Sequence, residues 1–114
     1  MVIVLNLFDI IPGKETQYAE YLRRVQPLLE RHNAHPFFYG RTKARFMGRC
    51  SQEYCGLIAY ATPADLTRFS HDPDFAKIRT IRDNSTCNYV LTVVEEIGFA
   101  EAIEILDPSS AKKD

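Results

Sequence analysis

Residues 71–85, HDPDFAKIRTIRDNS, decide the fold because they indicate where one helix ends and the next begins. Proline is favoured at the first position of a helix, so the sequence predicts that a helix restarts at Pro73. Its apolar stripe consists of Phe75, Ile78 and Ile81. At about 100° per residue, Arg82 falls about 20° from Phe75, on the same face. This helix therefore carries a guanidinium on the side that should be buried.

Apolar spacing on either side of this stretch predicts further helices and strands. The segment TPAD has the features of a helix start, with Thr62 as N-cap, Pro63 at the first position and Asp65 near the positive end of the helix. Pro27 lies inside an earlier helix and should bend it. The predicted strands are residues 2–10, 37–50, 55–61 and 87–97, and the predicted helices are 15–32, the two that meet at Asp72-Pro73, and a short one at 99–106.

The resulting order is β-α-β-β-α-β, which is typical of an α+β, ferredoxin-like fold. With two helical crossovers, the first and third strands are expected to flank one another in parallel, and the hairpin adds antiparallel pairing. Residues 1–98 are expected to form the domain. Residues 99–114 are expected to form an extension, a short helix followed by a disordered tail, DPSSAKKD.

The first strand and the last strand are apolar on both faces. Two helices can cover only one face of a four-stranded sheet, so the second face would be a large exposed apolar patch in a monomer. A second copy related by a two-fold axis is the simplest cover. The sequence therefore predicts a homodimer through the open sheet face.

Composition excludes several classes of function. A net charge of −1 over 114 residues argues against nucleic acid or an anionic membrane as the main partner. No apolar run reaches the roughly 18–20 residues of a membrane span, and the N-terminus, MVIVLNLFDII, has no basic n-region, so a cytoplasmic chain is expected. There is no glycine-rich phosphate loop, and the scattered histidines do not have metal-site spacing. No cofactor and no metal are expected.

The three cysteines do not suggest a disulfide framework. Cys50 and Cys55 enclose four residues, which is not the spacing of zinc knuckles. They could face each other across the hairpin, but free thiols are expected. If the hairpin pairs them, Arg45 lies opposite Tyr60 and stacks on it.

Three segments resemble a known superfamily: YAEYLRRVQPLLERH (18–32), GLIAYATPAD (56–65) and FSHDPDFAKIRTIRDNS (69–85). Over residues 2–97 the chain resembles the dimeric α+β barrel superfamily and, within it, the uncharacterised family domain of unknown function 1330. The resemblance implies a two-fold barrel with a pocket between sheet and helices. It implies no reaction, because relatives in the superfamily include monooxygenases, isomerases, dehalogenase-like proteins and small-molecule binders.

Arg82 and His71 are the candidate catalytic residues. Arg82 is interpreted as a clamp for a carboxylate or enolate oxygen, as a structural partner of Asp72, Asp74 or Asp83, or as a side chain that covers apolar surface while its charge reaches water. His71 precedes the helix break, where it could move a proton or simply cap the preceding helix.

The other candidate ligand-binding residues lie on the first helix and on strands. Tyr18 and Tyr21 are on the core stripe of that helix, and Asn6 is polar within an apolar strand, so it either orients a ligand or bonds a neighbour. The alternating Arg41, Lys43 and Arg45 either line a pocket or form a solvated face. His32 is expected to bond a backbone carbonyl. The candidate ligand-binding set is Asn6, Tyr18, Tyr21, Arg45, Tyr60 and Arg82.

These residues support three hypotheses. The first is a binder of a small anionic or aromatic molecule. The second is a cofactor-independent isomerase or monooxygenase in which Arg82 holds an oxyanion and His71 moves a proton. The third is a structural dimer with a closed core.

Overall fold

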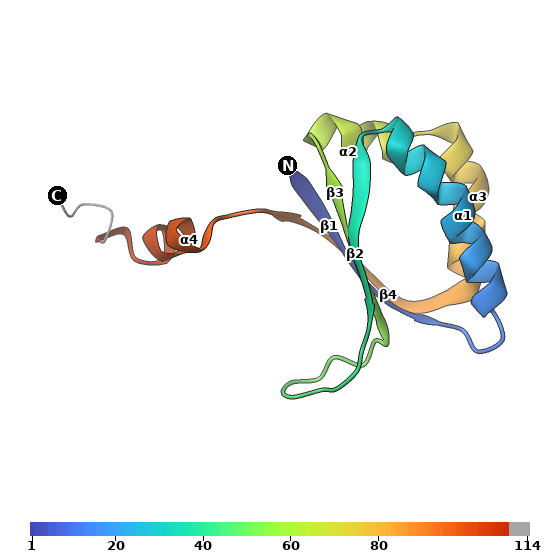
Figure 1. The fold of residues 1–114 in the computed structure, drawn as a ribbon, viewed down its shortest axis with the longest axis horizontal. Coiled ribbons are helices and arrows are strands. Elements are labelled where there is room, and N and C mark those ends of the chain that lie inside the picture. The colour runs from blue at the N-terminus through green and yellow to red at the C-terminus, as the bar shows by residue number, and fades with distance from the viewer. Residues whose placement is uncertain (110–114) are drawn as a thin grey trace.

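The computed structural model describes residues 1–109 and confirms the ferredoxin-like order β-α-β-β-α-β, followed by one more helix (Figure 1). Residues 110–114, which belong to the predicted tail, lie outside the described part. The elements are β1 (Val2–Ile10), α1 (Glu15–Arg31), β2 (Ala34–Arg41), β3 (Tyr54–Tyr60), α2 (Pro63–Ser70), α3 (Pro73–Ser85), β4 (Thr86–Glu95) and α4 (Phe99–Leu106).

The four strands form one sheet in the order β2-β3-β1-β4, and every neighbouring pair is antiparallel. β1 and β3 do flank one another, but the prediction that they run in parallel is wrong. The α1 crossover makes β2 parallel to β1 and leaves one position between them. β3 returns from β2 through a hairpin and fills that position, antiparallel to both neighbours.

The largest error in the predicted elements concerns β2, which covers Ala34–Arg41 and not residues 37–50. β2 pairs with β3 from Ala34 opposite Tyr60 to Arg41 opposite Tyr54, so its partner ends there. The chain then leaves the sheet as a loop over residues 42–53. The alternating basic residues beyond Arg41 therefore do not form a strand face, because alternation alone does not show where the partner strand ends.

This register also separates the two hairpin cysteines. Cys55 lies opposite Gly40, whereas Cys50 lies in the loop, and the cysteines are free thiols in the structure. The expected position of Arg45 opposite Tyr60 is wrong for the same reason, since Tyr60 lies opposite Ala34.

The helix boundaries follow the predicted caps closely. Thr62 forms a capping box with Asp65, and Pro63 is at the first position of α2. Asp72 caps α3 through a 2.9 Å bond from the Asp74 amide to its Oδ1. Pro27 lies inside α1, as its place in the sequence indicated. Capping oxygens satisfy amides that have no partner in the first turn, which fixes both helix starts.

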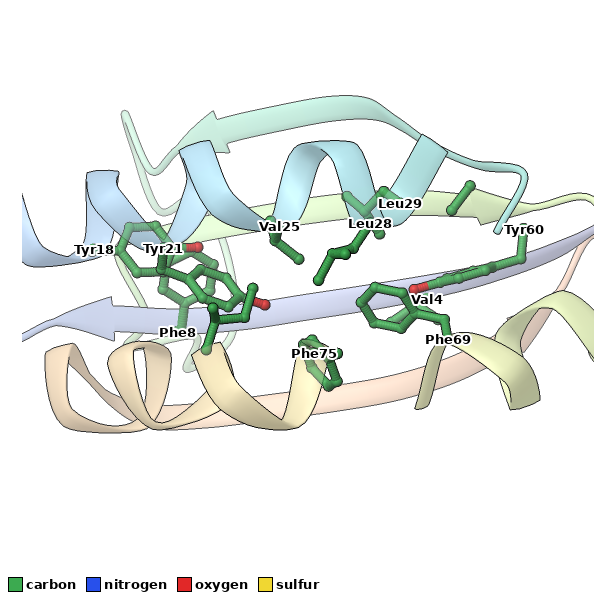
Figure 2. Close-up of a cluster of buried hydrophobic side chains, with 12 residues drawn as sticks. Val4, Phe8, Tyr18, Tyr21, Val25, Leu28, Leu29, Tyr60, Phe69 and Phe75 are labelled. Carbon is green, nitrogen blue, oxygen red and sulfur yellow. The ribbon is translucent and has the colours of Figure 1, made fainter. Parts of the chain in front are cut away.

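The core lies between the sheet and the helices, as Figure 2 shows. Phe8 of β1 is fully buried and stacks on Tyr54 and Tyr89, with ring centroids 5.7 and 5.2 Å away. The predicted stripe of α3 is confirmed, since Phe75 and Ile78 are buried. The buried apolar residues are Val4, Phe8, Tyr18, Tyr21, Val25, Leu28, Leu29, Ala34, Tyr60, Phe69, Phe75 and Ile78.

The opposite face of the sheet is open. Figure 1 shows α1 and α3 on one side of the sheet, with no element over the other side within residues 1–109. Ile3, Leu5 and Leu7 of β1 point to this side, because they alternate with the buried Val4, Asn6 and Phe8. Leu57 and Val90 lie opposite Leu5 and Leu7 and extend the apolar face. One helical layer therefore leaves an apolar sheet surface uncovered.

Candidate functional site

A cavity of about 590 Å³ lies between the helix-facing side of the sheet and the three helices α1, α2 and α3. Its walls are mainly apolar, and its polar groups are few. The apolar and aromatic lining residues are Val4, Tyr21, Leu22, Val25, Leu29, Pro36, Tyr39, Ile58, Tyr60, Leu66, Phe69, Phe75, Tyr89 and Leu91. The remaining lining residues are Asn6, Gln26, Ser70, Arg79 and Arg82. Binding cavities for small molecules are usually apolar and span about 300–1,000 Å³, so this one is large enough for a ligand.

Arg82 places its guanidinium in the wall of this cavity. Its side chain is only 17% exposed. The guanidinium carbon lies 5.1 Å from the centre of the Tyr89 ring and 5.8 Å from that of Phe75. Nε and Nη2 each donate to Oδ1 of Asp83, at 3.1 Å. Arg82 therefore pairs with an aspartate, as one interpretation expected, and it also lines the cavity. Its role as an anion clamp stays a prediction.

The Asp83 carboxylate neutralises Arg82 only in part. Its side chain is 54% exposed, so water screens the ion pair from that side. Both bonds go to one oxygen, and they use Nε and Nη2, which leaves Nη1 outside this pair. A guanidinium can engage more than one acceptor at once because it has five N–H donors in a plane.

Asn6 and Tyr89 connect Arg82 to the sheet. The Tyr89 hydroxyl donates to Oδ1 of Asn6 at 3.1 Å, so Asn6 bonds a neighbour and lines the cavity as well. Tyr89 lies on the helix side because it alternates with Val90, which lies opposite Leu7 of the open face. Next to it, a bulge in the β1–β4 pairing inserts one extra residue in β4, with Asn88 in the left-handed region at φ 52°. Asn88 also donates to Oδ2 of Asp9 at 2.9 Å, which holds the bulge in place.

Tyr18 and Tyr39 join α1 to β2 through a short hydrogen bond between their hydroxyls. The Tyr39 ring lies across Gly56, where an added Cβ would be 2.5 Å from its Cε1 atom. Only glycine permits this close approach. Tyr18 also packs on Tyr21, with ring centroids 5.8 Å apart. We call Asn6, Tyr18, Tyr21, Tyr39, Arg82 and Tyr89 the tyrosine–arginine cluster.

Burial raises the pKa of each tyrosine in this cluster. The pKa of Tyr21 rises to about 12, although the Arg82 guanidinium acts in the opposite direction. Burial likewise raises the pKa of Tyr18, Tyr39 and Tyr89. Burial disfavours the charged form of Arg82, but Tyr21, Tyr89 and Asp83 favour it, and its pKa is raised overall. At neutral pH the cluster therefore presents neutral hydroxyls around one cation.

Groups that exchange protons near neutral pH do not line this cavity. Within residues 1–109, the lining contains no histidine, aspartate, glutamate, lysine or cysteine. General acid–base catalysis is most efficient when the catalytic pKa lies near the working pH. Tyrosines with raised pKa values and the two arginines of the lining, Arg79 and Arg82, instead suit hydrogen bonding to, and charge pairing with, a bound anion.

The structure brings some of the candidate residues together and separates others. Asn6, Tyr21, Tyr60 and Arg82 line the cavity, and Tyr18 lies beside it, bonded to Tyr39. Two candidates lie elsewhere, His71 and Arg45.

His71 is exposed, and its Nδ1 lies 2.9 Å from the carbonyl oxygen of Thr67 at the end of α2. This matches the capping interpretation. Arg45 lies in the loop of residues 42–53 and bonds the carbonyl oxygens of Cys50 and Ser51 and the Glu53 carboxylate. Neither side chain lines the cavity.

His32 has a carboxylate partner and not the expected backbone carbonyl. Its Nε2 lies 2.7 Å from Oδ2 of Asp72, which also accepts from Arg31 at 2.9 Å. The His32 bond, followed by the Asp74 amide and Arg31, lowers the pKa of Asp72 to about 2. The Asp72 carboxylate thus ties the end of α1 to the start of α3, next to Phe69 in the cavity wall.

Two members of the cluster, Tyr39 and Tyr89, were not among the predicted site residues. A bulge in β2 between Pro36 and Phe38 brings Tyr39 to the helix side, whereas Tyr89 shares that side with Leu91 through the ordinary alternation of β4. The two-residue spacing of Tyr89 and Leu91 in the last strand is a sequence signal that places both on one face. No signal in the sequence marks the β2 bulge.

Comparison with solved structures shows the same fold. A protein of unknown function from Rhodopseudomonas palustris is 18% identical with a TM-score of 0.76, covering 85% of this chain and 82% of its own. A dimeric ferredoxin-like protein of unknown function from Jannaschia sp. CCS1 is 14% identical with a TM-score of 0.70, covering 83% and 98%. A candidate antibiotic biosynthesis monooxygenase from Nitrosomonas europaea is 10% identical with a TM-score of 0.64, covering 86% and 100%.

At these identities the likeness concerns the fold alone. No curated protein matches the chain. Within residues 1–109, no helix combines the length and the apolar character needed to cross a membrane. The model of one family, the Domain of unknown function (DUF1330), matches residues 7–97. This match spans β1 to β4 and with them the whole tyrosine–arginine cluster except Asn6, and the chain therefore belongs to the DUF1330 family.

Proposed function

We propose that this protein binds a small anionic molecule with an aromatic or apolar body in the cavity between the sheet and the helices. The observation that carries this proposal is the Arg82 guanidinium in the wall of an apolar cavity, over the ring of Tyr89 and among neutral tyrosines that include Tyr21. A carboxylate or phenolate oxygen there would accept from the guanidinium and from the Tyr21 hydroxyl, since the Tyr89 hydroxyl already donates to Asn6. The apolar wall formed by Val25, Leu29 and Phe69 would cover the rest of the ligand.

The cost of burying a cation supports an anionic ligand. A charge taken out of water needs a partner, and Asp83 supplies it only from the solvent side. A ligand anion inside the cavity would pair with the guanidinium where water is excluded, and a neutral ligand would not. The cavity is therefore expected to bind a carboxylate much more tightly than the matching amide.

We propose, as part of the same function, that the protein works as a homodimer through the open sheet face. The apolar residues Ile3, Leu5, Leu7, Leu57 and Val90 form this face, and one layer of helices leaves it uncovered. The Jannaschia protein, which has the same fold, is described as dimeric. No nucleic acid or membrane partner is proposed, and the cytoplasmic location expected from the sequence stays a prediction.

The alternative is a cofactor-independent isomerase or monooxygenase that uses the same cavity. The Nitrosomonas neighbour is the observation in its favour. Such an enzyme would use Arg82 to hold an oxyanion, but His71, the proposed proton carrier, lies outside the cavity. The Tyr18–Tyr39 hydroxyl pair would have to take that role, with pKa values raised far from neutrality. Binding therefore has the stronger support.

A thermal-shift screen tests the binding proposal. The probes are naphthoate, phenylacetate and salicylate, each beside its neutral amide. A ligand at 100 times its dissociation constant stabilises by about 2.7 kcal/mol, which should raise the melting temperature by about 10 °C. We expect a carboxylate to shift the wild type and its amide to shift it little.

Two variants test whether the thermal shift caused by a carboxylate depends on Arg82. Arg82→Gln should lose the shift, and Lys77→Gln should keep it, because Lys77 is an exposed cation on the same helix that does not line the cavity. A shift that persists in Arg82→Gln would refute the role of Arg82. A shift of equal size with the amides would refute the preference for anions.

A further inference from the structure

Two segments project from opposite ends of the sheet. The loop of residues 42–53 leaves β2 at Arg41, beside the Phe8 end of β1, and the arm of residues 96–107, which contains α4, leaves β4 at Glu95, opposite Val2. Figure 1 shows both on the side of the sheet away from α1 and α3. The open sheet face therefore has one projecting segment at each end.

Both segments expose large apolar side chains. Phe46 and Met47 in the loop are 99% and 93% exposed. Phe99 and Leu106 in α4 are 90% and 83% exposed, and no residue of α4 is buried. Isolated helices shorter than about 12–15 residues are marginal in water, so an apolar helix of this length needs a surface to pack on.

The two segments carry opposite charges. The loop contains Lys43, Arg45 and Arg49, and only Arg45 has an ion-pair partner, Glu53, within residues 1–109. The arm contains Glu96, Glu101 and Glu104. Each segment thus combines exposed apolar groups with a net charge, positive in the loop even after Glu53 is counted and negative in the arm, and the two are complementary in both respects.

A two-fold axis determines which segments can meet when a second copy covers the open face. If the axis crosses the strands, the Phe8 end of one sheet lies over the Val2 end of the other. The basic loop of each copy then lies at the same end of the dimer as the acidic arm of its partner, the loop leaving from the edge strand β2 and the arm from the edge strand β4. If the axis runs along the strands, loop meets loop and arm meets arm, which brings like charges together.

We propose that α4 of one copy packs against the loop of residues 42–53 of a second copy, and that the reverse contact forms at the other end of the same dimer. Phe99 and Leu106 would cover Phe46 and Met47, and the glutamates would pair with Lys43 and Arg49. The proposal rests on the homodimer proposed above and specifies its orientation. The matched family region ends at residue 97, before α4 begins.

Cross-linking between single-cysteine chains tests the orientation. The background replaces Cys50 and Cys87 by serine and Cys55 by alanine, and Ala44→Cys and Ala100→Cys are then made in separate chains. The two proteins are mixed, allowed to exchange subunits and treated with a short bis-maleimide, which adds to both thiols. We expect a cross-linked dimer in the mixture, where about half of the dimers pair the two variants, and little from either protein alone.

The possible results distinguish a failure of the arm contact from a failure of the proposed homodimer. Cross-links from each variant alone, with none added by mixing, would refute the orientation. A wild-type protein that sediments as a monomer would refute the dimer and the arm contact together. A wild-type dimer without a cross-link in the mixture would refute the arm contact alone.

A second test retains the native cysteines, so that it does not depend on the cysteine-free background folding. Phe99→Ala should weaken dimerisation by about 100-fold, because each dimer has two arms and the loss at each is about tenfold. Glu101→Lys with Glu104→Lys should weaken it most at low salt, whereas Glu30→Lys on the helix surface should not. An unchanged dissociation constant for Phe99→Ala, measured by analytical ultracentrifugation, would contradict the contact.

Discussion

Replacing Gly56 by alanine should disturb the cavity wall through a single contact. The new Cβ would lie 2.5 Å from Cε1 and 2.9 Å from Cδ1 of Tyr39, whereas ordinary carbon contacts are about 3.5–4.0 Å. The Tyr39 ring must therefore move away from Gly56. Its hydrogen bond to the buried hydroxyl of Tyr18 is then lost.

The change in the free energy of unfolding caused by Gly56→Ala is the sum of two opposing contributions. Leaving a buried hydroxyl without its partner costs about 1–3 kcal/mol. Gly56 has no positive φ, so alanine fits the backbone and recovers about 0.4–1 kcal/mol by restricting the unfolded chain. The net loss should be about 1–2 kcal/mol, a fall in melting temperature of about 4–8 °C.

A double-mutant cycle with Tyr39→Ala isolates the contact. In that background the ring is absent, so Gly56→Ala should become stabilising by about 0.4–1 kcal/mol. Urea unfolding followed by circular dichroism measures all four proteins. An equal cost of Gly56→Ala in both backgrounds would refute the reasoning, because the cost would then come from the backbone or from another neighbour.

Three further predictions concern the core and the helix ends. Phe8→Ala should lower the free energy of unfolding by about 3–5 kcal/mol, because Phe8 is fully buried and packed on all sides, and urea unfolding measures this. Thr62→Ala should cost about 1 kcal/mol through loss of the α2 N-cap, while Thr16→Ala, at an exposed position outside any cap, should cost little. Asp72→Asn should destabilise the protein at neutral pH. The Asp72 pKa is lowered from 3.8 to about 2, so its contribution is complete above about pH 4 and is lost as pH falls toward 2. Unfolding curves of wild type and Asp72→Asn should therefore converge over that range, and a constant difference down to pH 2 would contradict the assignment.

The elements that could be predicted from the sequence are those fixed by local chemistry. Pro63 and Pro73 mark helix starts because proline lacks an amide that the first turn does not need. The caps Thr62 and Asp72 supply oxygens to free amides, and their spacing is visible in the chain itself. The placement of Arg82 on a buried stripe was also visible, since it depends only on the helical period.

The errors concern pairing between distant segments. The end of β2 depends on where β3 ends, and the antiparallel placement of β3 beside β1 depends on how the hairpin fits beside the α1 crossover. Neither is a property of one segment. The partner of His32 could not be found for the same reason, because Asp72 lies 40 residues away along the chain.

By itself the sequence determined the order of the elements, the helix boundaries, the two-faced apolar character of β1 and the inward position of Arg82. Only the tertiary structure decided that Tyr39 and Tyr89 join Arg82 in one cavity, and that Arg45 and His71 stay outside it. Periodicity and capping depend on residues a few positions apart, and they can therefore be recognised in the sequence. A cavity is formed where strands and helices meet, and the one-residue bulge in β2 changes which side chains it receives.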